Sequence, residues 1–531
     1  MNRESQGNTI QLILDGQNFF HELRNQLEAV RLSPVADNTY VRLAFWEAEH
    51  NLNLQSPTAG PTLETALKWV ANVGHRVEII LWKPSALSRR FDPTLSVPVY
   101  NTNLATMNTL HGYNNNLIQV YFEEYKGWIA GISTHQKIAI FSIGGVFRVL
   151  IGGINLARFY WDSDTHPCAA PYAPHAGMDG NSCHDAAVLI RGPATLDVER
   201  EWLRRWNKQY YLTPRNQIKG NIANNPISAN GATVNVVTTN SESWAGREAD
   251  IQALLIRKIS RATNYIYLEN YAFCDPGLVW AICKRLREHR TLKVIVMIPH
   301  RHFELHPFNY LARIAYAKLA LTNCITFSSN GNQIFRRDCQ TYKISENLNI
   351  WSTSESILST VRNRWLESDS VSFRRRIDRN TTTVRLSDIT SFDGGIRFYT
   401  PARRIGGALH WIYIHSKLAL IDDETAFIGT SNFSYRSMVY DGEIGICISN
   451  GQTVRNIRNT LFAHWGLNVA DVRTNWDREV RRFQVGVGNG LGVVNLNITD
   501  LDRYPFPVAA GGAIRNDDTN RQYKYLNYTY Y

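Results

Sequence analysis

The feature that most constrains this chain is a motif that occurs twice. The copies lie within residues 134–141 (THQKIAIF), with His135 and Lys137, and residues 414–438 (IHSKLALIDDETAFIGTSNFSYRSM), with His415 and Lys417. In each copy a hydrophobic run typical of a buried strand follows the lysine. Residues i and i+2 of a strand point to the same face, so each histidine and its lysine are expected to face one common space.

The repeat extends beyond the motifs. The other paired segments are 40–47 with 265–271, 76–82 with 292–299, 151–155 with 428–432, and 184–188 with 441–445. Strand patterns alternate with helix patterns such as residues 18–31, which indicates an α/β fold. Corresponding elements in the same order are difficult to reach by chance, so we predict two homologous α/β/α sandwich halves.

A stretch rich in Asn, Gly and Pro at residues 219–232 separates the two copies and suits an exposed connection. The predicted divisions are a first half at 1–225, a second half at 230–500 and a C-terminal tail at 501–531. The second half carries a basic insert near 307–404, where Arg374, Arg375 and Arg376 are consecutive. Charge runs are usually solvated surface, and the alternative is a lid or anion-binding rim over the site.

The net charge of +11 over 531 residues, with a pI of about 9.2, favours anionic partners such as phospholipid headgroups, nucleic acid or other phosphates. Solubility alone would also account for it. No secretory signal or run of apolar residues long enough for a membrane span is visible. Seven cysteines, few and odd in number, fit a reducing compartment. We therefore expect a cytoplasmic protein, or one exported without a classical signal peptide, in which case a Cys168–Cys183 disulfide is possible.

An imidazole beside a fixed ammonium suits attack on a phosphate or protonation of its leaving group. A bare His-x-Lys is common, whereas the full run ending in Gly429-Thr430-Ser431-Asn432 is much more specific. The doubled motif resembles the signature of the phospholipase D superfamily, whose members build one active site from two such motifs. The resemblance implies halves related by a pseudo-twofold axis and a reaction through a phosphohistidine.

The resemblance also implies a role for each site residue. His135 is expected to be the nucleophile and His415 the general acid and base, although the sequence cannot separate these two roles. The non-bridging phosphate oxygens are expected to be held by Lys137, Lys417, Asn155 and Asn432. Asp185 is expected to orient His135, and Glu443 to orient His415, with Asp441 as a competitor of Glu443. No metal or cofactor is expected in this chemistry because the lysines supply the positive charge.

Two further features leave alternatives open. Ser142 stands where Asp422 ends the second motif, which either is tolerated, because that aspartate is mainly structural in the family, or marks a weakened first half. A group of potential zinc ligands lies within twenty residues and matches no standard finger spacing: His166, Cys168, His175, Cys183 and His184.

The sequence therefore predicts a monomeric phosphodiesterase or phosphatidyltransferase that cleaves phospholipid headgroups and contacts the membrane surface peripherally. The substrate would be an anionic or zwitterionic phosphodiester. A nuclease, or a phosphotransferase acting on another diester, is the enzymatic alternative. The third hypothesis is a non-catalytic protein that binds an anion or lipid.

Overall fold

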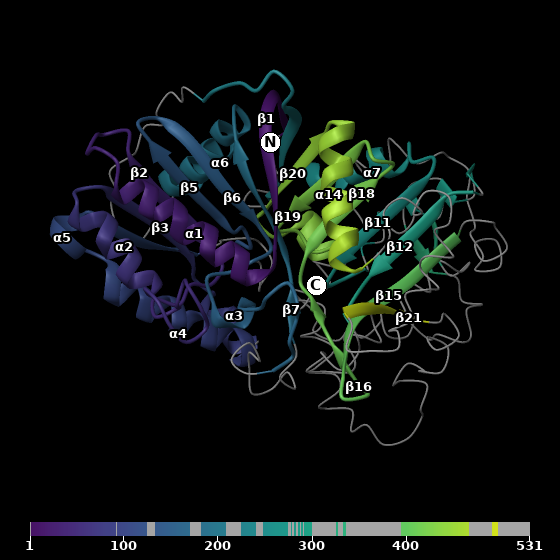
Figure 1. The fold of residues 1–531 in the computed structure, drawn as a ribbon, viewed down its shortest axis with the longest axis horizontal. Helices are drawn as coiled ribbons and strands as arrows, with labels where there is room; N and C mark the ends of the chain where they lie inside the picture. The colour runs from purple at the N-terminus through teal and green to yellow at the C-terminus, as the bar shows by residue number, and fades with distance from the viewer. Residues whose placement is uncertain are drawn as a thin grey trace.

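The computed structural model describes most of the two predicted halves (Figure 1). The described residues are 2–91, 93–124, 133–169, 182–208, 225–240, 248–273, most of 275–299, 325–327, 333–335, 395–466 and 491–496. The first half lies to the left of Figure 1 in purple and blue, the second half lies to the right in teal and green, and strand β1 runs between them.

The first half alternates strands and helices in the order that the sequence predicts. Its main elements are β1 (Asn2–Leu14), α1 (Asp15–Arg31), β2 (Tyr40–Phe45), α2 (Leu63–Asn72), β3 (Arg76–Trp82), α3 (Ala86–Phe91), α4 (Pro93–Leu110), α5 (Tyr113–Asn116), β4 (Ile118–Glu123), β5 (Ile138–Ile143), β6 (Val146–Gly152), β7 (Cys183–His184), β8 (Ala186–Arg191) and α6 (Ala194–Lys208).

The second half repeats this order. Its elements are β9 (Ala232–Asn240), β10 (Glu248–Ala249), α7 (Asp250–Ile259), β11 (Tyr265–Asn270), β12 (Lys293–Met297), β15 (Gly395–Ile405), β16 (Ala408–Trp411), β17 (Tyr413–Ile414), β18 (Lys417–Ile421), β19 (Thr425–Gly429), α13 (Tyr435–Val439), β20 (Glu443–Ser449), α14 (Gly451–His464) and β21 (Leu491–Leu496). A separate hairpin pairs β13 (Ile325–Phe327) with β14 (Gln333–Phe335).

The strand pairing is symmetric about the centre of the molecule. From one edge the ladder runs β4–β3–β2–β5–β6–β8–β1, and from the other it runs β15–β12–β11–β18–β19–β20–β9. The two series meet where β1 pairs antiparallel with β9. In each series the outer three strands are parallel and the rest are antiparallel. This arrangement confirms the predicted α/β fold of two similar halves.

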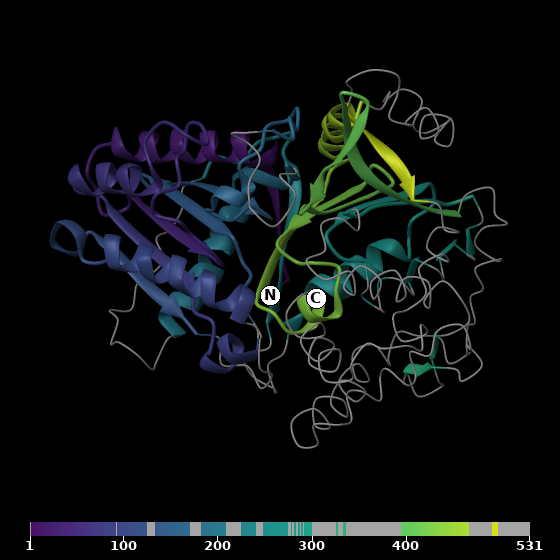
Figure 2. The same ribbon diagram turned by 90° about the horizontal axis from the view of Figure 1, so that it is seen from below.

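Three hydrophobic cores cover these strands in the described part of the chain. Helices α1 and α2 cover one face of the first half, and α7 covers the corresponding face of the second half. A third core contains residues from both halves, including Trp202 of α6 and Phe462 of α14. Because this core is shared, the two halves bury apolar surface against each other, and both views show them in contact along the centre (Figure 2).

Local structure agrees with the sequence except at the start of α1. Phe19, Leu23, Leu27 and Val30 form its buried stripe as their spacing predicts. The helix, however, begins at the Asp15-Gly16 pair, before the predicted helix pattern at residues 18–31. Asp15 has a φ of 64°, a left-handed conformation that is uncommon for a residue with a side chain.

Several predictions concern parts of the chain outside the described residues. These are most of the 307–404 insert, including Arg374, Arg375 and Arg376, the 501–531 tail, and residues 219–224 of the 219–232 connection. The proposed divisions at 225, 230 and 500 remain predictions. Among the described residues, no helix has both the length and the apolar character needed to cross a bilayer.

Candidate active site

Each motif histidine is reached by a chain segment that crosses to the other half. The His135 backbone N–H donates to the Gly442 carbonyl oxygen at 2.8 Å, next to a parallel bridge between Thr134 and Gly442. In the same way, the His415 N–H donates to the His184 carbonyl oxygen at 2.8 Å, where β17 pairs in parallel with β7. Each histidine is therefore fixed beside the segment of the opposite half that carries a carboxylate, Glu443 for His135 and Asp185 for His415.

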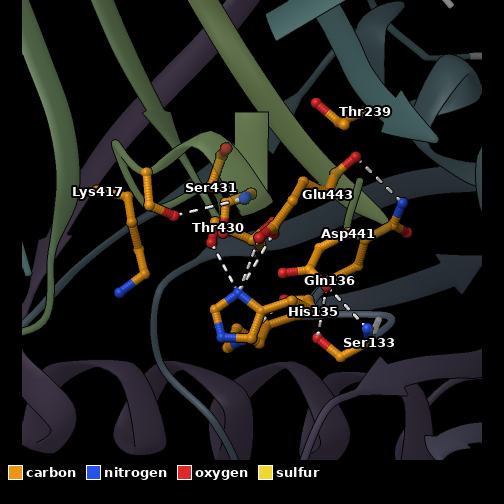
Figure 3. A network of polar contacts seen from close by, with 12 residues as sticks. Ser133, His135, Gln136, Thr239, Lys417, Thr430, Ser431, Asp441 and Glu443 are labelled. Carbon is orange, nitrogen blue, oxygen red and sulfur yellow. Dashed lines mark hydrogen bonds and ion pairs between the residues drawn. The ribbon is translucent and has the colours of Figure 1, made fainter. Parts of the chain in front are cut away.

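This crossing corrects the predicted pairing of histidines and carboxylates. The Nδ1 of His135 lies 3.1 Å from Glu443 Oε1, and the Nδ1 of His415 lies 2.7 Å from Asp185 Oδ2 (Figure 3 shows the first pair). The prediction had Asp185 on His135 and Glu443 on His415. It was wrong because residues close to a motif in the sequence are not those that its crossing segment meets in space.

The contacts of His135 fix its tautomer. Its Nδ1 is also 3.0 Å from the Thr430 carbonyl oxygen, which can only accept a hydrogen bond. Nδ1 therefore carries the hydrogen, and Nε2 holds the lone pair. The side chains of His135 and His415 are 14% and 12% exposed, whereas Glu443 and Asp185 are at most 2% exposed. The ring edge opposite Nδ1 is thus the part that a substrate can reach.

Lys137 and Lys417 lie on the same side of the site as their histidines. Each Nζ donates to the carbonyl oxygen of its own motif histidine, His135 at 2.7 Å in the first motif and His415 in the second. Burial lowers the pKa of Lys137 to about 7 and that of Lys417 to about 8. Two buried ammonium groups without a bound anion are costly, so the site favours an anionic ligand.

Burial and the two lysine charges act together on the histidines. Burial lowers the pKa of both His135 and His415 well below the ordinary value, and Lys137 and Lys417 lower both further. Each lysine acts on both histidines, which places all four groups in one electrostatic cluster. Burial also raises the pKa of Glu443 to about 7 and that of Asp185 to about 6.

The two predicted asparagine ligands differ in their surroundings. Asn155 is engaged with protein groups, since Oδ1 accepts from the Glu47 N–H at 3.3 Å and Nδ2 donates to the Tyr160 hydroxyl at 3.0 Å. Asn432 Oδ1 is buried and accepts no hydrogen bond within the described part of the chain. Asp441 accepts from the Ser133 N–H at 2.8 Å and so positions the crossing segment, and its charge also acts on His135.

Aromatic side chains form walls beside both histidines. Trp46 lies 5.9 Å from His135 between ring centroids and stacks on Trp82 at 5.2 Å. Tyr160 lies 5.0 Å from His415. These residues were not predicted as part of the site. A signal for Trp46 existed, because it directly follows the strand that the internal repeat identified.

The two halves have different residues at the position next to the orienting carboxylate. The second half has a threonine beside Glu443, and the first half has a glycine beside Asp185. Thr430 occupies the position that Gly153 occupies in the first half, and its Oγ1 donates to Glu443 Oε2 at 2.5 Å. A Cβ at Gly153 would lie 2.1 Å from Asp185 Oδ1. The first half therefore needs glycine at this position so that the Asp185 carboxylate can reach its place beside His415.

The exchange of aspartate for serine at the end of the first motif has a local explanation. The Asp422 carboxylate accepts from the backbone N–H groups of Thr263 at 2.5 Å and of Asn264 and Tyr265 at 2.8 Å. Ser142 instead donates to the Asn38 carbonyl oxygen at 2.6 Å. Asp422 thus holds the segment that leads into β11 and Ser142 holds the segment that leads into β2, and neither is among the contacts of the histidines.

The group of potential zinc ligands proposed from the sequence is not assembled as a set. Cys168 and Cys183 are free thiols, so the described structure contains no disulfide between them. His175 lies outside the described residues. His166 and His184 do lie close together, with ring centroids 5.7 Å apart.

The fold and site together define a class of protein in which one chain brings two His-x-Lys motifs to a shared centre. Comparison with known proteins agrees. Residues 381–465, which contain the second motif, match the family described as "Cardiolipin synthase, PLD-like domain". This match, the doubled motif and the phospholipase D relatives support a member of the phospholipase D superfamily.

Two proteins similar to this chain in sequence are named phospholipase D. Human phospholipase D1 is 26% identical over 305 residues, covering 52% of this chain and 24% of that protein. Phospholipase D A of Dictyostelium discoideum is 23% identical over 287 residues, covering 50% and 18%. The matched region thus spans about a quarter or less of these relatives. The crystal structure of a phosphatidylserine synthase from Haemophilus influenzae Rd KW20 aligns over 98% of this chain and 95% of its own, at 11% identity and a TM-score of 0.48.

Proposed function

We propose that this protein cleaves the headgroup phosphodiester of phospholipids through a phosphohistidine and transfers the phosphatidyl group to water or an alcohol. The observation that carries the proposal is the pair of motif histidines, each with Nδ1 held by a carboxylate of the opposite half and with its other edge accessible. A nucleophile and a general acid are thus present in one site, next to two lysines.

In the first step, the Nε2 lone pair of His135 attacks phosphorus. A P–N bond forms, the P–O bond to the headgroup alcohol breaks, and His415 gives its Nε2 proton to that oxygen. In the second step, His415 takes a proton from water or an alcohol as its oxygen attacks phosphorus, and the P–N bond breaks. Lys137 and Lys417 stabilise the charge on the non-bridging oxygens in both steps.

The contacts of the two rings support this division of roles. His135 has two acceptors at Nδ1, Thr430 O and Glu443, which keep Nε2 unprotonated for attack. His415 has one carboxylate, Asp185, at 2.7 Å, which favours the imidazolium that a general acid requires against the burial and lysine charges that lower its pKa. Phospholipid is the preferred substrate class because the similar proteins bear phospholipase D names.

The test measures choline release from phosphatidylcholine vesicles without added metal, and phosphatidylethanol formation when ethanol is present. We expect both products, and expect His135→Ala and His415→Ala to lower the rate by about 10³-fold or more. His21→Ala serves as control, because this histidine lies on α1, contacts the Gln55 carbonyl oxygen and takes no part in the site.

Parallel reactions with single-stranded DNA and RNA distinguish the alternatives. Cleavage of nucleic acid without lipid turnover would replace the proposal with a nuclease function. Vesicle binding without turnover of any diester would indicate a non-catalytic binding protein. Lipid turnover that both alanine variants retain would contradict the proposed site.

A further inference from the structure

A second cluster of ionisable side chains lies outside the phosphate site. It contains Asp15, His166, His184 and His464, each with one ligand-type atom, and these atoms all lie within 4.8 Å of one another. The side chains of Asp15, His166 and His184 are 0% exposed, and that of His464 is 6% exposed. The phosphate chemistry described above uses none of the four side chains.

The distances inside the cluster are short. His166 Nε2 lies 3.0 Å from His464 Nε2, and Asp15 Oδ2 lies 3.7 Å from each of them. Asp15 Oδ1 lies 2.8 Å from His184 Nδ1. Nevertheless, Asp15 Oδ2 is buried and makes no hydrogen bond. Buried polar atoms nearly always have a partner, so this oxygen, aimed at the imidazole nitrogens of His166 and His464, indicates a ligand.

Two of the histidines have a carboxylate on the far side of the ring. His166 Nδ1 lies 2.7 Å from Asp162 Oδ2, and His184 Nε2 lies 3.1 Å from Glu269 Oε2. A carboxylate that accepts from one imidazole nitrogen turns the lone pair of the other nitrogen toward a metal ion. Here those other nitrogens are His166 Nε2 and His184 Nδ1, which both face the cluster.

We propose that Asp15, His166, His184 and His464 bind one divalent metal ion of the zinc class in a closed structural site. Three imidazole nitrogens and one carboxylate oxygen are ligands that Zn²⁺ prefers, whereas Ca²⁺ and Mg²⁺ require oxygen-rich sites. Tetrahedral bonds of about 2.0–2.1 Å place ligand atoms about 3.3 Å apart. The observed separations of 2.8, 3.0 and 3.7 Å span this value.

The buried charges support a cation at this position. Asp15, Asp162 and Glu269 bring three buried carboxylates to the cluster. A metal ion would offset this negative charge. The competing explanation is a proton network in which an imidazolium at His184 bridges Asp15 and Glu269, and the experiment below separates the two.

The site would join the two halves next to the catalytic centre. Asp15 begins α1 and His184 ends β7 in the first half, whereas His464 ends α14 in the second. The His184 carbonyl oxygen accepts the His415 N–H, and Asp185 follows directly. A metal ion here would therefore hold the strand that positions the His415–Asp185 pair.

The test uses the full chain, produced in zinc-supplemented medium and freed of any affinity tag. Elemental analysis is expected to find about one zinc ion per chain. His464→Ala and His166→Ala should lose it, and Asp162→Asn should weaken zinc affinity about 10–100-fold. His75→Ala, which removes a buried histidine outside the cluster, and His135→Ala should retain the metal.

Thermal unfolding gives an independent measurement. Removing zinc with phenanthroline should lower the Tm of the wild-type chain and of His135→Ala, and should leave the Tm of His464→Ala unchanged. Wild-type chain that holds no stoichiometric metal and gains no Tm on zinc titration would overturn the proposal in favour of the proton network. Metal retained equally by the His464 and His166 variants would also overturn it. If those variants fail to fold, the Asp162→Asn affinity and the wild-type titration decide.

Discussion

His135 is hydrogen-bonded through Nδ1 to Glu443, which lies 308 positions later in the chain and in the other half of the molecule. The relationship is reciprocal, because Asp185 of the first half holds His415 of the second. Neither half by itself pairs its motif histidine with a carboxylate. The site therefore exists only when the halves are docked.

The crossed pairing predicts which reaction step each carboxylate supports. With a p-nitrophenyl phosphodiester, the leaving group needs no proton, so Asp185→Asn should leave attack by His135 intact. The second step needs His415 as a base and should slow about 10²–10⁴-fold. Stopped-flow absorbance should then show a burst of one nitrophenol per enzyme, with a phosphohistidine that can be trapped by acid quench.

Glu443→Gln is the matched variant for this experiment. It weakens support for the nucleophile, so the burst itself should slow. The Thr430 carbonyl oxygen still accepts from His135 Nδ1, so the loss should be smaller, about 10–100-fold. A burst in Glu443→Gln and none in Asp185→Asn would mean that the nucleophile is His415.

The sequence was sufficient to predict the fold and the gathering of the motif histidines and lysines, for a physical reason. Strands such as Arg76–Trp82 can be predicted from the local periodicity of apolar residues. The internal repeat then predicts that the chain folds into two similar halves. The motif residues come together because corresponding strands occupy corresponding places in the ladder. These predictions need no knowledge of which distant residues are in contact, beyond the pseudo-symmetry of the two halves.

The pairing of side chains across the halves could not be predicted in this way. It depends on β7 beside β17 and on the Thr134–Gly442 bridge, which are contacts between distant segments. The same holds for His464, whose neighbour His166 is 298 positions away. Periodicity describes which face of an element is buried, and it carries no information on which buried faces meet.

Gly153→Ala should impair the reaction although glycine takes no direct part in it. The new Cβ would lie 2.1 Å from Asp185 Oδ1, so the carboxylate must move away from His415. We expect kcat to fall about 10²-fold. The double variant Gly153→Ala/Asp185→Asn should be no slower than Asp185→Asn alone, because both changes remove the same interaction. Additive losses would contradict this explanation.

The pH dependence of kcat/KM should be bell-shaped with a maximum near neutrality. Glu443 and Asp185, with pKa values of about 7 and 6, must be ionised, so activity is lost as pH falls through these values. Lys137 and Lys417, with pKa values of about 7 and 8, must be protonated, so activity is lost as pH rises through theirs.

Lys137→Arg tests the alkaline limb of this profile, because Lys137 has the lower of the two lysine pKa values. A guanidinium stays charged at high pH, so the limb should move to higher pH even if the maximal rate falls. Initial rates between pH 5 and pH 9.5 at low substrate concentration measure both profiles. A wild-type profile that rises steadily to pH 9.5 would exclude the lysines as the groups that must be charged.

Asp422 and Ser142 should matter for stability and not for chemistry. Asp422→Ala leaves three backbone N–H groups without their acceptor, and we expect it to lower the free energy of unfolding by about 2–4 kcal/mol. Ser142→Ala removes one hydrogen bond to the Asn38 carbonyl oxygen and should cost about 1 kcal/mol. Urea titration measures both changes, and kcat of the folded variants should stay within about threefold of wild type.

Ser142→Asp separates a degenerate motif from an adapted one. If serine were only a lost aspartate, restoring the acid would stabilise the first half. In the structure, the Ser142 hydroxyl donates to a carbonyl oxygen 2.6 Å away, and an ionised carboxylate there would face that oxygen without a hydrogen to share. We therefore expect Ser142→Asp to destabilise the protein more than Ser142→Ala does, because it adds repulsion to the lost hydrogen bond. A rise in the urea midpoint with Ser142→Asp would show that the first half has retained the aspartate-binding turn of the second.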